Sequence, residues 1–301
     1  MNNRLMKIIA AAHLILALAG GTLLIGQKMI QVKGSDTMVN LVQILAEKYM
    51  EQNSKQPIAV LGGGSGTGVT GMINGTCDIA NTSRDWKPKE IDQAWEKGIK
   101  PRMFAVAIDG LSVIVNEKNP LTKLTMGQVG AIYRGEVKNW KAVGGLDQKV
   151  SLYGRQSNSG TYVFMMEHVL GNKPYSTDMK EMNGNAQIIE GVLTDVGAVG
   201  YVGVGYIVDK ATGKPMKGLK VLNISKDEKA EAFSPLDKAA VDSGTYPVSR
   251  PLWMATNGMP KGTAAGFLAW IISPEGQKVV ENEGFYTVGV KLMDQNLKNL
   301  K

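Results

Sequence analysis

One segment near the middle of the chain joins a strand, a short polar loop and a helix without interruption. Residues 150–153 form a short run typical of a strand, and residues 154–161 contain an arginine, three small hydroxyl residues and two glycines. Apolar residues then recur at helical spacing over 163–170, which predicts a helix that begins near Ser159. A strand that leads directly into a helix is typical of α/β folds.

This loop has the chemistry of an anion site. The first N–H groups of a helix lack partners, and the helix dipole places partial positive charge at the same end. Arg155 adds a planar guanidinium that can hold two oxygens at once. A serine before a helix is by itself more typical of an ordinary N-cap. The interpretation as a ligand site depends on two further copies of the arrangement.

The two further copies lie in the first quarter of the chain. A predicted strand over 29–33 leads into the small polar loop 34–37, and a second strand, Ile58–Leu61, leads into the glycine-rich loop 62–68. A helix should follow each loop, the first over 38–52. The glycines of the second loop allow a ligand to approach the backbone amides closely. Three helix N-termini therefore carry loops suited to an oxyanion.

Strands and helices alternate along the rest of the chain, which favours an α/β fold with mostly parallel sheets and a ligand at the carboxyl ends of the strands. Asp109 and Gly110 separate two apolar strands, as expected where a chain crosses between two lobes. The other predicted strands lie at 78–80, 102–108, 111–116, 198–203, 221–224 and 253–256, and the other predicted helices begin at Pro88, Thr125, Asn185, Thr263 and Pro274.

Residues 1–26 differ from the rest. Arg4 and Lys7 precede an uncharged stretch over 8–25, the pattern of a secretory signal peptide. The stretch is also long enough to remain as a membrane anchor, and both alternatives imply export. Without the two leader charges, 32 basic and 27 acidic residues leave a net charge of +5. This charge is spread along the chain, which disfavours nucleic acid as a partner and suits a small anion.

Several kinds of chemistry lack the residues they require. His168 is the only histidine outside the leader, and no serine or cysteine stands at nucleophile-elbow spacing, so a Ser–His hydrolase is not expected. Cys77 is the only cysteine, so we expect a small buried residue, no disulfide and no metal site. Residues 66–71 match G-x-G-x-x-G, but a short following helix and export disfavour a dinucleotide. We therefore expect binding without turnover: no enzyme and no cofactor.

Taken together, the motifs resemble the periplasmic phosphate-binding proteins of ABC phosphate importers, the PstS-type substrate-binding proteins. The resemblance covers the exported part of the chain. It implies a type II-like periplasmic-binding-protein fold, in which two α/β lobes joined by crossing strands close over the anion. It also implies a first lobe of residues 29–109 plus 205–301 and a second lobe of residues 110–204. The motifs that carry it are G-S-D-T-M at 34–38, G-G-G-S-G-T-G at 62–68, D-I-A-N-T-S-R at 78–84, residues 155–161, G-Y-V at 200–202 and G-T-Y-P at 244–247.

The resemblance also implies a set of phosphate ligands. Residue by residue, they are Thr37, Met38, Ser65, Arg155, Ser159, Gly160 and Thr161. Well-studied members place an acidic residue where this chain has Ser83, and an aspartate where it has Ser157. Those carboxylates accept the phosphate proton and restrain the arginine. Here we expect Ser83 to contact phosphate, and Asp36, Asp85 and Ser157 are the candidates for accepting its proton.

The expected function is capture of inorganic phosphate by a monomer that delivers it to a membrane ABC permease. The alternative keeps the fold but changes the ligand to another oxyanion, namely sulfate, molybdate or tungstate. Phosphate near pH 7 is partly protonated and can donate a hydrogen bond, whereas sulfate cannot. A site that offers only donors accepts both anions, and a carboxylate acceptor penalises sulfate.

Overall fold

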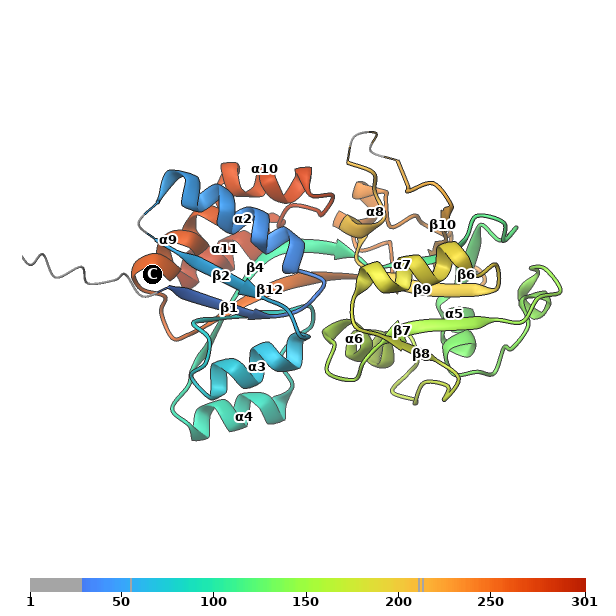
Figure 1. Ribbon diagram of the computed structural model, residues 1–301, viewed down its shortest axis with the longest axis horizontal. Helices are drawn as coiled ribbons and strands as arrows, with labels where there is room; N and C mark the ends of the chain where they lie inside the picture. The colour runs from blue at the N-terminus through green and yellow to red at the C-terminus, as the bar shows by residue number, and fades with distance from the viewer. Residues whose placement is uncertain (1–28, 55, 211, 213) are drawn as a thin grey trace, which may run out of the picture.

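The computed structural model describes residues 29–54, 56–210, 212 and 214–301 and divides into two bodies, each built on a five-stranded sheet (Figure 1). The predicted leader, residues 1–26, lies outside the described residues. No helix within the described ranges combines the length and the apolar character that crossing a bilayer requires.

The first sheet has the strand order β2-β1-β3-β12-β4. Strand β1 pairs in parallel with β2 and β3, whereas β12 is antiparallel to both β3 and β4. The chain leaves this body along β4 and returns along β12, so these neighbours must run in opposite directions. The strands are β1 Ile30–Gly34, β2 Ile58–Leu61, β3 Ile79–Thr82, β4 Pro101–Gly110 and β12 Ser249–Asn257.

The second sheet has the order β10-β5-β9-β7-β8. Here β7 is parallel to β8 and β9, and β5 is antiparallel to β9 and β10. Both sheets are therefore mixed, which corrects the expectation of mostly parallel sheets. The strands are β5 Ser112–Asn116, β7 Ser151–Arg155, β8 Lys180–Met182, β9 Ala198–Val202 and β10 Leu219–Val221, and a separate pair joins β6 Lys123–Thr125 to β11 Asn223–Ser225.

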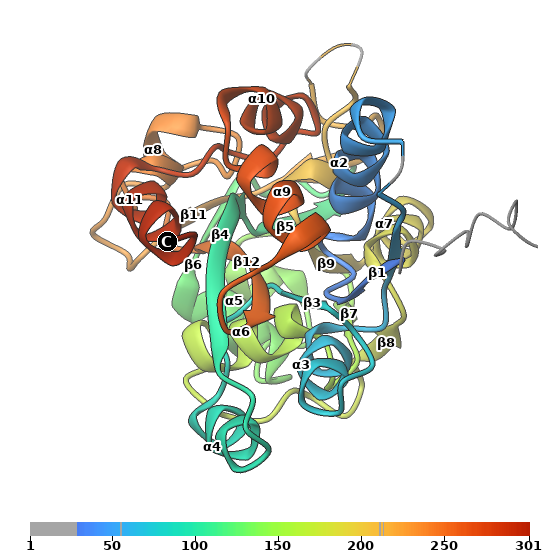
Figure 2. The same ribbon diagram turned by 90° about the vertical axis from the view of Figure 1, so that its left-hand side faces the viewer.

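Helices cover both faces of the first sheet (Figure 2). Helix α2 follows the predicted period and buries Leu41, Val42, Leu45, Ala46 and Tyr49 in one cluster with apolar residues of α9 and the sheet. The opposite face carries α3 and α4 over a smaller cluster that includes Cys77, whose burial raises the pKa of the thiol to about 11. The helices are α2 Val39–Gln52, α3 Ser65–Ile73, α4 Pro88–Glu96, α9 Gly262–Ile271, α10 Pro274–Asn282 and α11 Val290–Asn299.

The helices of the second body have 5 to 10 residues. The predicted capping box before α5 is present, because Gln128 N donates to Thr125 Oγ1 at 3.1 Å and Thr125 N donates to Gln128 Oε1 at 2.8 Å. The helices are α5 Met126–Tyr133, α6 Gly160–His168, α7 Asn185–Thr194 and α8 Lys238–Asp242, with single 3₁₀ turns at Trp140–Val143 and Val204–Tyr206.

The boundary between the bodies differs from the predicted lobes after residue 205. The single strand predicted over 221–224 is two short strands, and the first of them, β10, pairs with β5 of the second sheet. The residues that follow, including Leu222, Ile224 and Tyr246, share a hydrophobic cluster with Leu111 of the second body. Backbone pairing and core packing thus join this stretch to the second sheet. We propose lobes of about 30–109 plus 250–301 and about 111–248.

Gly34 ends β1 immediately before the first predicted anion loop, and its position demands glycine. A Cβ there would lie 2.1 Å from the backbone oxygen of Asn81 on β3, at a φ of +139°. Gly34→Ala should lower the free energy of unfolding by about 3 kcal/mol, because neither strand can move away without breaking the sheet. Gly75→Ala, at a φ of +69° with nothing within 4 Å, should cost only about 1 kcal/mol. Equal losses in urea unfolding would contradict this packing.

Candidate functional site

The three polar loops meet between the two bodies. Thr37, which precedes α2 of the first body, lies with its Oγ1 2.9 Å from Oγ1 of Thr161 on α6 of the second body. A Cβ added to Gly160 would lie 2.2 Å from Ser65 Oγ and 2.7 Å from Ser83 Oγ. The N-terminus of α6 therefore abuts the N-termini of α2 and α3. The structure brings together predicted ligand residues that are more than 120 positions apart in the chain.

Nearly all of these side chains are withdrawn from solvent. A buried polar group without a hydrogen-bond partner costs free energy. The donors and acceptors that these side chains leave unpaired therefore indicate which kind of ligand the site can bind. The predicted ligand residues with an exposed fraction of at most 2% are Thr37, Met38, Ser65, Ser83, Arg155, Ser159 and Thr161.

The serine hydroxyls are arranged as donors. Ser159 is the N-cap of α6, and its Oγ accepts hydrogen bonds from the amides of Thr161 at 3.2 Å and Tyr162 at 3.4 Å. Its hydroxyl hydrogen therefore remains available to a ligand. The Oγ of Ser65 accepts from the amide of Ser83 at 3.1 Å and lies 3.4 Å from the Oγ of Ser83, so one of these two hydroxyl hydrogens joins them and the other remains for a ligand. Donors of this kind suit an anion.

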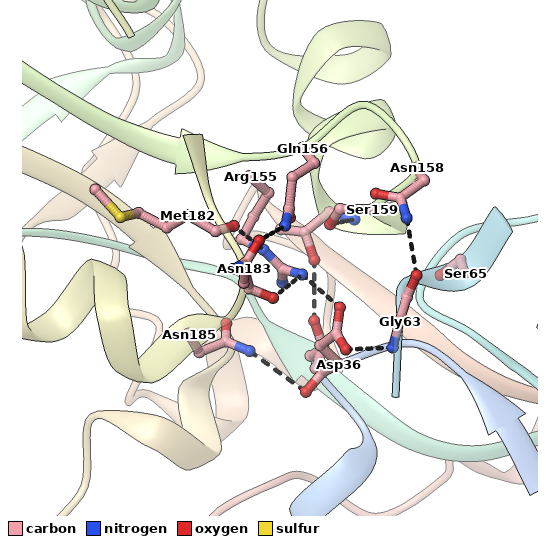
Figure 3. Close-up of polar contacts among 12 residues, drawn as sticks. Asp36, Gly63, Ser65, Arg155, Gln156, Asn158, Ser159, Met182, Asn183 and Asn185 are labelled. Atoms are coloured by element: carbon pink, nitrogen blue, oxygen red, sulfur yellow. Dashed lines mark hydrogen bonds and ion pairs between the residues drawn. The ribbon is translucent and has the colours of Figure 1, made fainter. Parts of the chain in front are cut away.

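Arg155 is held from both bodies (Figure 3). Its Nη2 lies 2.5 Å from Oδ2 of Asp36, across the space between the lobes, and the other carboxylate oxygen accepts from the amide of Gly63 at 2.7 Å. Within the second body, Nε donates to the carbonyl of Met182 and Nη2 to that of Asn183, each at 3.1 Å. The orientation of the guanidinium is thus fixed by a carboxylate and two carbonyls.

Two tyrosines support this ion pair. The hydroxyl of Tyr206 donates to the carbonyl of Asp36 at 2.8 Å, and the hydroxyl of Tyr201 accepts from the amide of Arg155 at 3.0 Å. Burial raises the pKa of each tyrosine to about 12, so both hydroxyls are neutral at physiological pH. Asn185 Nδ2 lies 3.5 Å from the same Asp36 carbonyl.

Asn158 joins the bodies at the rim of the site. Its side-chain amide donates to the carbonyl of Gly63 at 2.8 Å (Figure 3). Its own backbone carbonyl accepts from the amide of Gly66 at 3.0 Å. Asn158, Asn185 and Tyr206 were absent from the predicted set. For Asn158 there was a signal, since it lies inside the segment 154–161 that carries the other ligands.

The candidate proton acceptors separate into two groups. Asp36 belongs to the buried cluster through Arg155, whereas Asp85 and Ser157 are exposed residues. The guanidinium of Arg84 forms its ion pair with Glu90 at 2.7 Å and contacts Asp85 only through the backbone carbonyl, also at 2.7 Å. Of the three candidates, Asp36 alone contacts a predicted phosphate ligand through its side chain among the described residues.

Other features bear on the chemistry of the site. The amide of Met38 donates to the carbonyl of Ser35 at 3.0 Å, so it closes a turn. The side chain of Asn81, at the end of β3, is fully buried and neither of its polar atoms has a partner among the described residues. His168 lies stacked on Phe164, with ring centroids 4.2 Å apart. Within the described ranges, no three His, Cys, Asp or Glu residues form a group that could hold a metal.

Comparison with known proteins identifies the family. The model of the PBP superfamily domain matches residues 20–275. The phosphate-binding protein PstS of Pseudomonas aeruginosa is 31% identical over 285 residues, which cover 89% of this chain and 85% of that protein. PstS of Staphylococcus aureus is 30% identical over 274 residues, which cover 89% of this chain and 81% of that protein.

Solved structures of similar proteins support the same family. A phosphate ABC transporter substrate-binding protein from Clostridium perfringens with bound phosphate superposes with a TM-score of 0.75 at 26% identity and covers 87% of this chain and all of its own. An ABC-type phosphate transport receptor from Vibrio cholerae has a TM-score of 0.69 at 29% identity, with 86% of this chain and all of its own covered. The two-lobed α/β fold and the family resemblance expected from the motifs are confirmed. The chain belongs to the PBP superfamily and, within it, to the PstS family of phosphate-binding proteins.

Proposed function

We propose that this protein captures inorganic phosphate between its two lobes and delivers it to an ABC-type permease. The observation that carries the proposal is the convergence of Thr37, Ser65 and Thr161, from three helix N-termini and two lobes, in one buried cluster. The functions of the related proteins, phosphate binding and phosphate transport, support it. The proposed ligands are Thr37, Met38, Ser65, Ser83, Arg155, Ser159, Gly160 and Thr161.

The chemistry of the cluster is that of binding rather than turnover. An oxyanion would be held by hydroxyl hydrogens, by backbone amides at the helix N-termini and by the positive end of each helix dipole. His168, the only histidine outside the leader, contacts Phe164 and takes no part in the cluster. We therefore propose a binding protein without enzymatic activity. The proposal includes export, with residues 1–26 as signal peptide or anchor.

A second candidate ligand is another tetrahedral oxyanion such as sulfate. The hydroxyls of Ser159 and Ser65 are arranged to donate hydrogen bonds, and sulfate, like phosphate, can accept them. Discrimination in favour of phosphate then depends on Asp36, whose carboxylate can accept a proton from phosphate but repels sulfate.

The first prediction concerns Arg155. Arg155→Ala should weaken phosphate binding at least about tenfold in calorimetric titration, because a charge-assisted contact is lost, and Arg155→Lys should restore it only in part. His168→Ala is the control and should bind phosphate as the wild type does. Unchanged affinity in the Ala variant would exclude Arg155 as the principal charged ligand.

The second prediction concerns selectivity. Asp36→Asn should raise the affinity for sulfate relative to phosphate by about tenfold, since the repulsion between a carboxylate and a fully deprotonated anion disappears. The exposed Asp85 provides the matched control, and Asp85→Asn should leave the ratio unchanged. Competition titrations with both anions measure this ratio. A constant ratio in Asp36→Asn would mean that hydroxyls alone set the selectivity.

The third prediction concerns closure. Asp36 with Arg155, Thr37 with Thr161 and Gly63 with Asn158 all bond across the lobes, so a phosphate that binds both sides favours the closed arrangement. Small-angle scattering should show a smaller radius of gyration at saturating phosphate than without it. Identical curves would indicate a site that is closed before the anion arrives.

A further inference from the structure

An ion pair occupies the point where the chain crosses between the lobes. Arg250 on β12 faces Asp109 on β4 in the strand register, and its Nε and Nη2 lie 3.2 and 2.9 Å from Oδ2 of Asp109. The two side chains are 2% and 0% exposed. The other carboxylate oxygen accepts from the amide of Val204 at 2.9 Å. Burial lowers the pKa of Arg250, and the adjacent Asp109 opposes that shift.

Arg250 also reaches the predicted anion site. Its Nη2 lies 2.9 Å from Oγ1 of Thr161, and that same oxygen lies 2.9 Å from Oγ1 of Thr37. The guanidinium stacks over the ring of Phe164 at 5.0 Å, which holds it against α6. A continuous chain of contacts therefore runs from the crossing strands to two threonines of opposite lobes.

The direction of these hydrogen bonds follows from the donor inventory. A guanidinium can only donate, so Thr161 must accept from Arg250. Thr37 and Thr161 carry one hydroxyl hydrogen each, and one of the two makes the bond between them. No other described residue accepts from either hydroxyl, so the second hydrogen is left for a ligand. The pair thus presents a donor, as an anion requires.

We propose that Arg250 is a positioning residue for the anion: it acts through Thr161 and fixes the threonine pair as a hydrogen-bond donor. This inference rests on the proposed function. Loss of Arg250 would free a lone pair of Thr161, and the two hydroxyls could then turn an acceptor toward the anion. The charge of Arg250 is balanced by Asp109, so its contribution comes through orientation rather than through a free positive charge.

The test is a comparison of Arg250→Lys in three backgrounds, with phosphate affinity measured by calorimetry. A lysine keeps the charge beside Asp109, but a single ammonium group cannot replace both arms of the fork. The change should weaken binding about tenfold in the wild type and in Thr161→Ser, which keeps the hydroxyl. In Thr161→Val, where no hydroxyl remains to be oriented, the same change should cost less than about twofold. If Arg250 has only a structural role, the losses should be equal in all three backgrounds. Equal losses, or no loss of affinity in the wild type, would overturn the inference.

The controls separate this inference from the proposed function. Arg134→Gln removes a different guanidinium, paired with Glu136 on the second lobe, and should leave phosphate affinity unchanged. If Arg250→Lys fails to fold, the double variant Asp109→Asn/Arg250→Gln removes both buried charges and enters the same three-background comparison. A wild type that does not bind phosphate would refute the proposed function. A wild type that binds, with equal losses in every background, would refute the role of Arg250 alone.

Discussion

The ion pair between Arg155 and Asp36 joins the two lobes, because each lobe supplies one of its two charges. Arg155 is 1% exposed, and an unpaired guanidinium in such a place would cost several kcal/mol. Its carboxylate comes from the opposite lobe, whereas the family pattern supplies one two residues after the arginine, where this chain has the exposed Ser157. Moving the lobes apart must therefore separate Arg155 from its counter-charge while Met182 and Asn183 still hold it. In the proposed closure, orientation of the arginine and approach of the lobes are therefore a single process.

The crossing strands obey the same electrostatic constraint. Asp109 and Arg250 are buried where β4 and β12 run side by side, so neither charge is tolerated without the other. This pair stays together whatever the lobes do, because both residues lie in one antiparallel register. In the proposed closure the two ion pairs therefore differ in kind: the pair of Asp109 and Arg250 persists, whereas the pair of Asp36 and Arg155 forms or breaks as the lobes move. Thr161, in the second lobe, lies between them and bonds to Thr37 and Arg250 of the first lobe.

Local physics made part of this arrangement predictable. Small polar loops and apolar periodicity predicted the helices at Val39–Gln52, Ser65–Ile73 and Gly160–His168, although the second of them begins at Ser65, inside the predicted loop 62–68. The antiparallel pairing of β12 was not predictable, because it depends on a chain that leaves one lobe and returns more than 130 residues later. The position of β10 was not predictable either, because its three residues show no periodic pattern and are placed by their pairing with β5. Asp36 was named only as a proton acceptor, since no local rule connects it to an arginine 119 residues away.

Charge balance limits how this site can hold an anion. Arg155 is paired with Asp36, Arg250 with Asp109 and Arg84 with Glu90, so each buried arginine near the cluster already has a carboxylate among the described residues. An incoming phosphate consequently meets no cation without a carboxylate partner there, and apart from Arg155 its charge must be stabilised by hydroxyls, amides and helix dipoles, each contributing on the order of 1 kcal/mol. Such contacts are strong together only while water is excluded, because the effective dielectric constant rises when the lobes part. Many modest donors divided between two lobes would therefore hold the anion tightly when closed and release it when open, as delivery to a second protein requires.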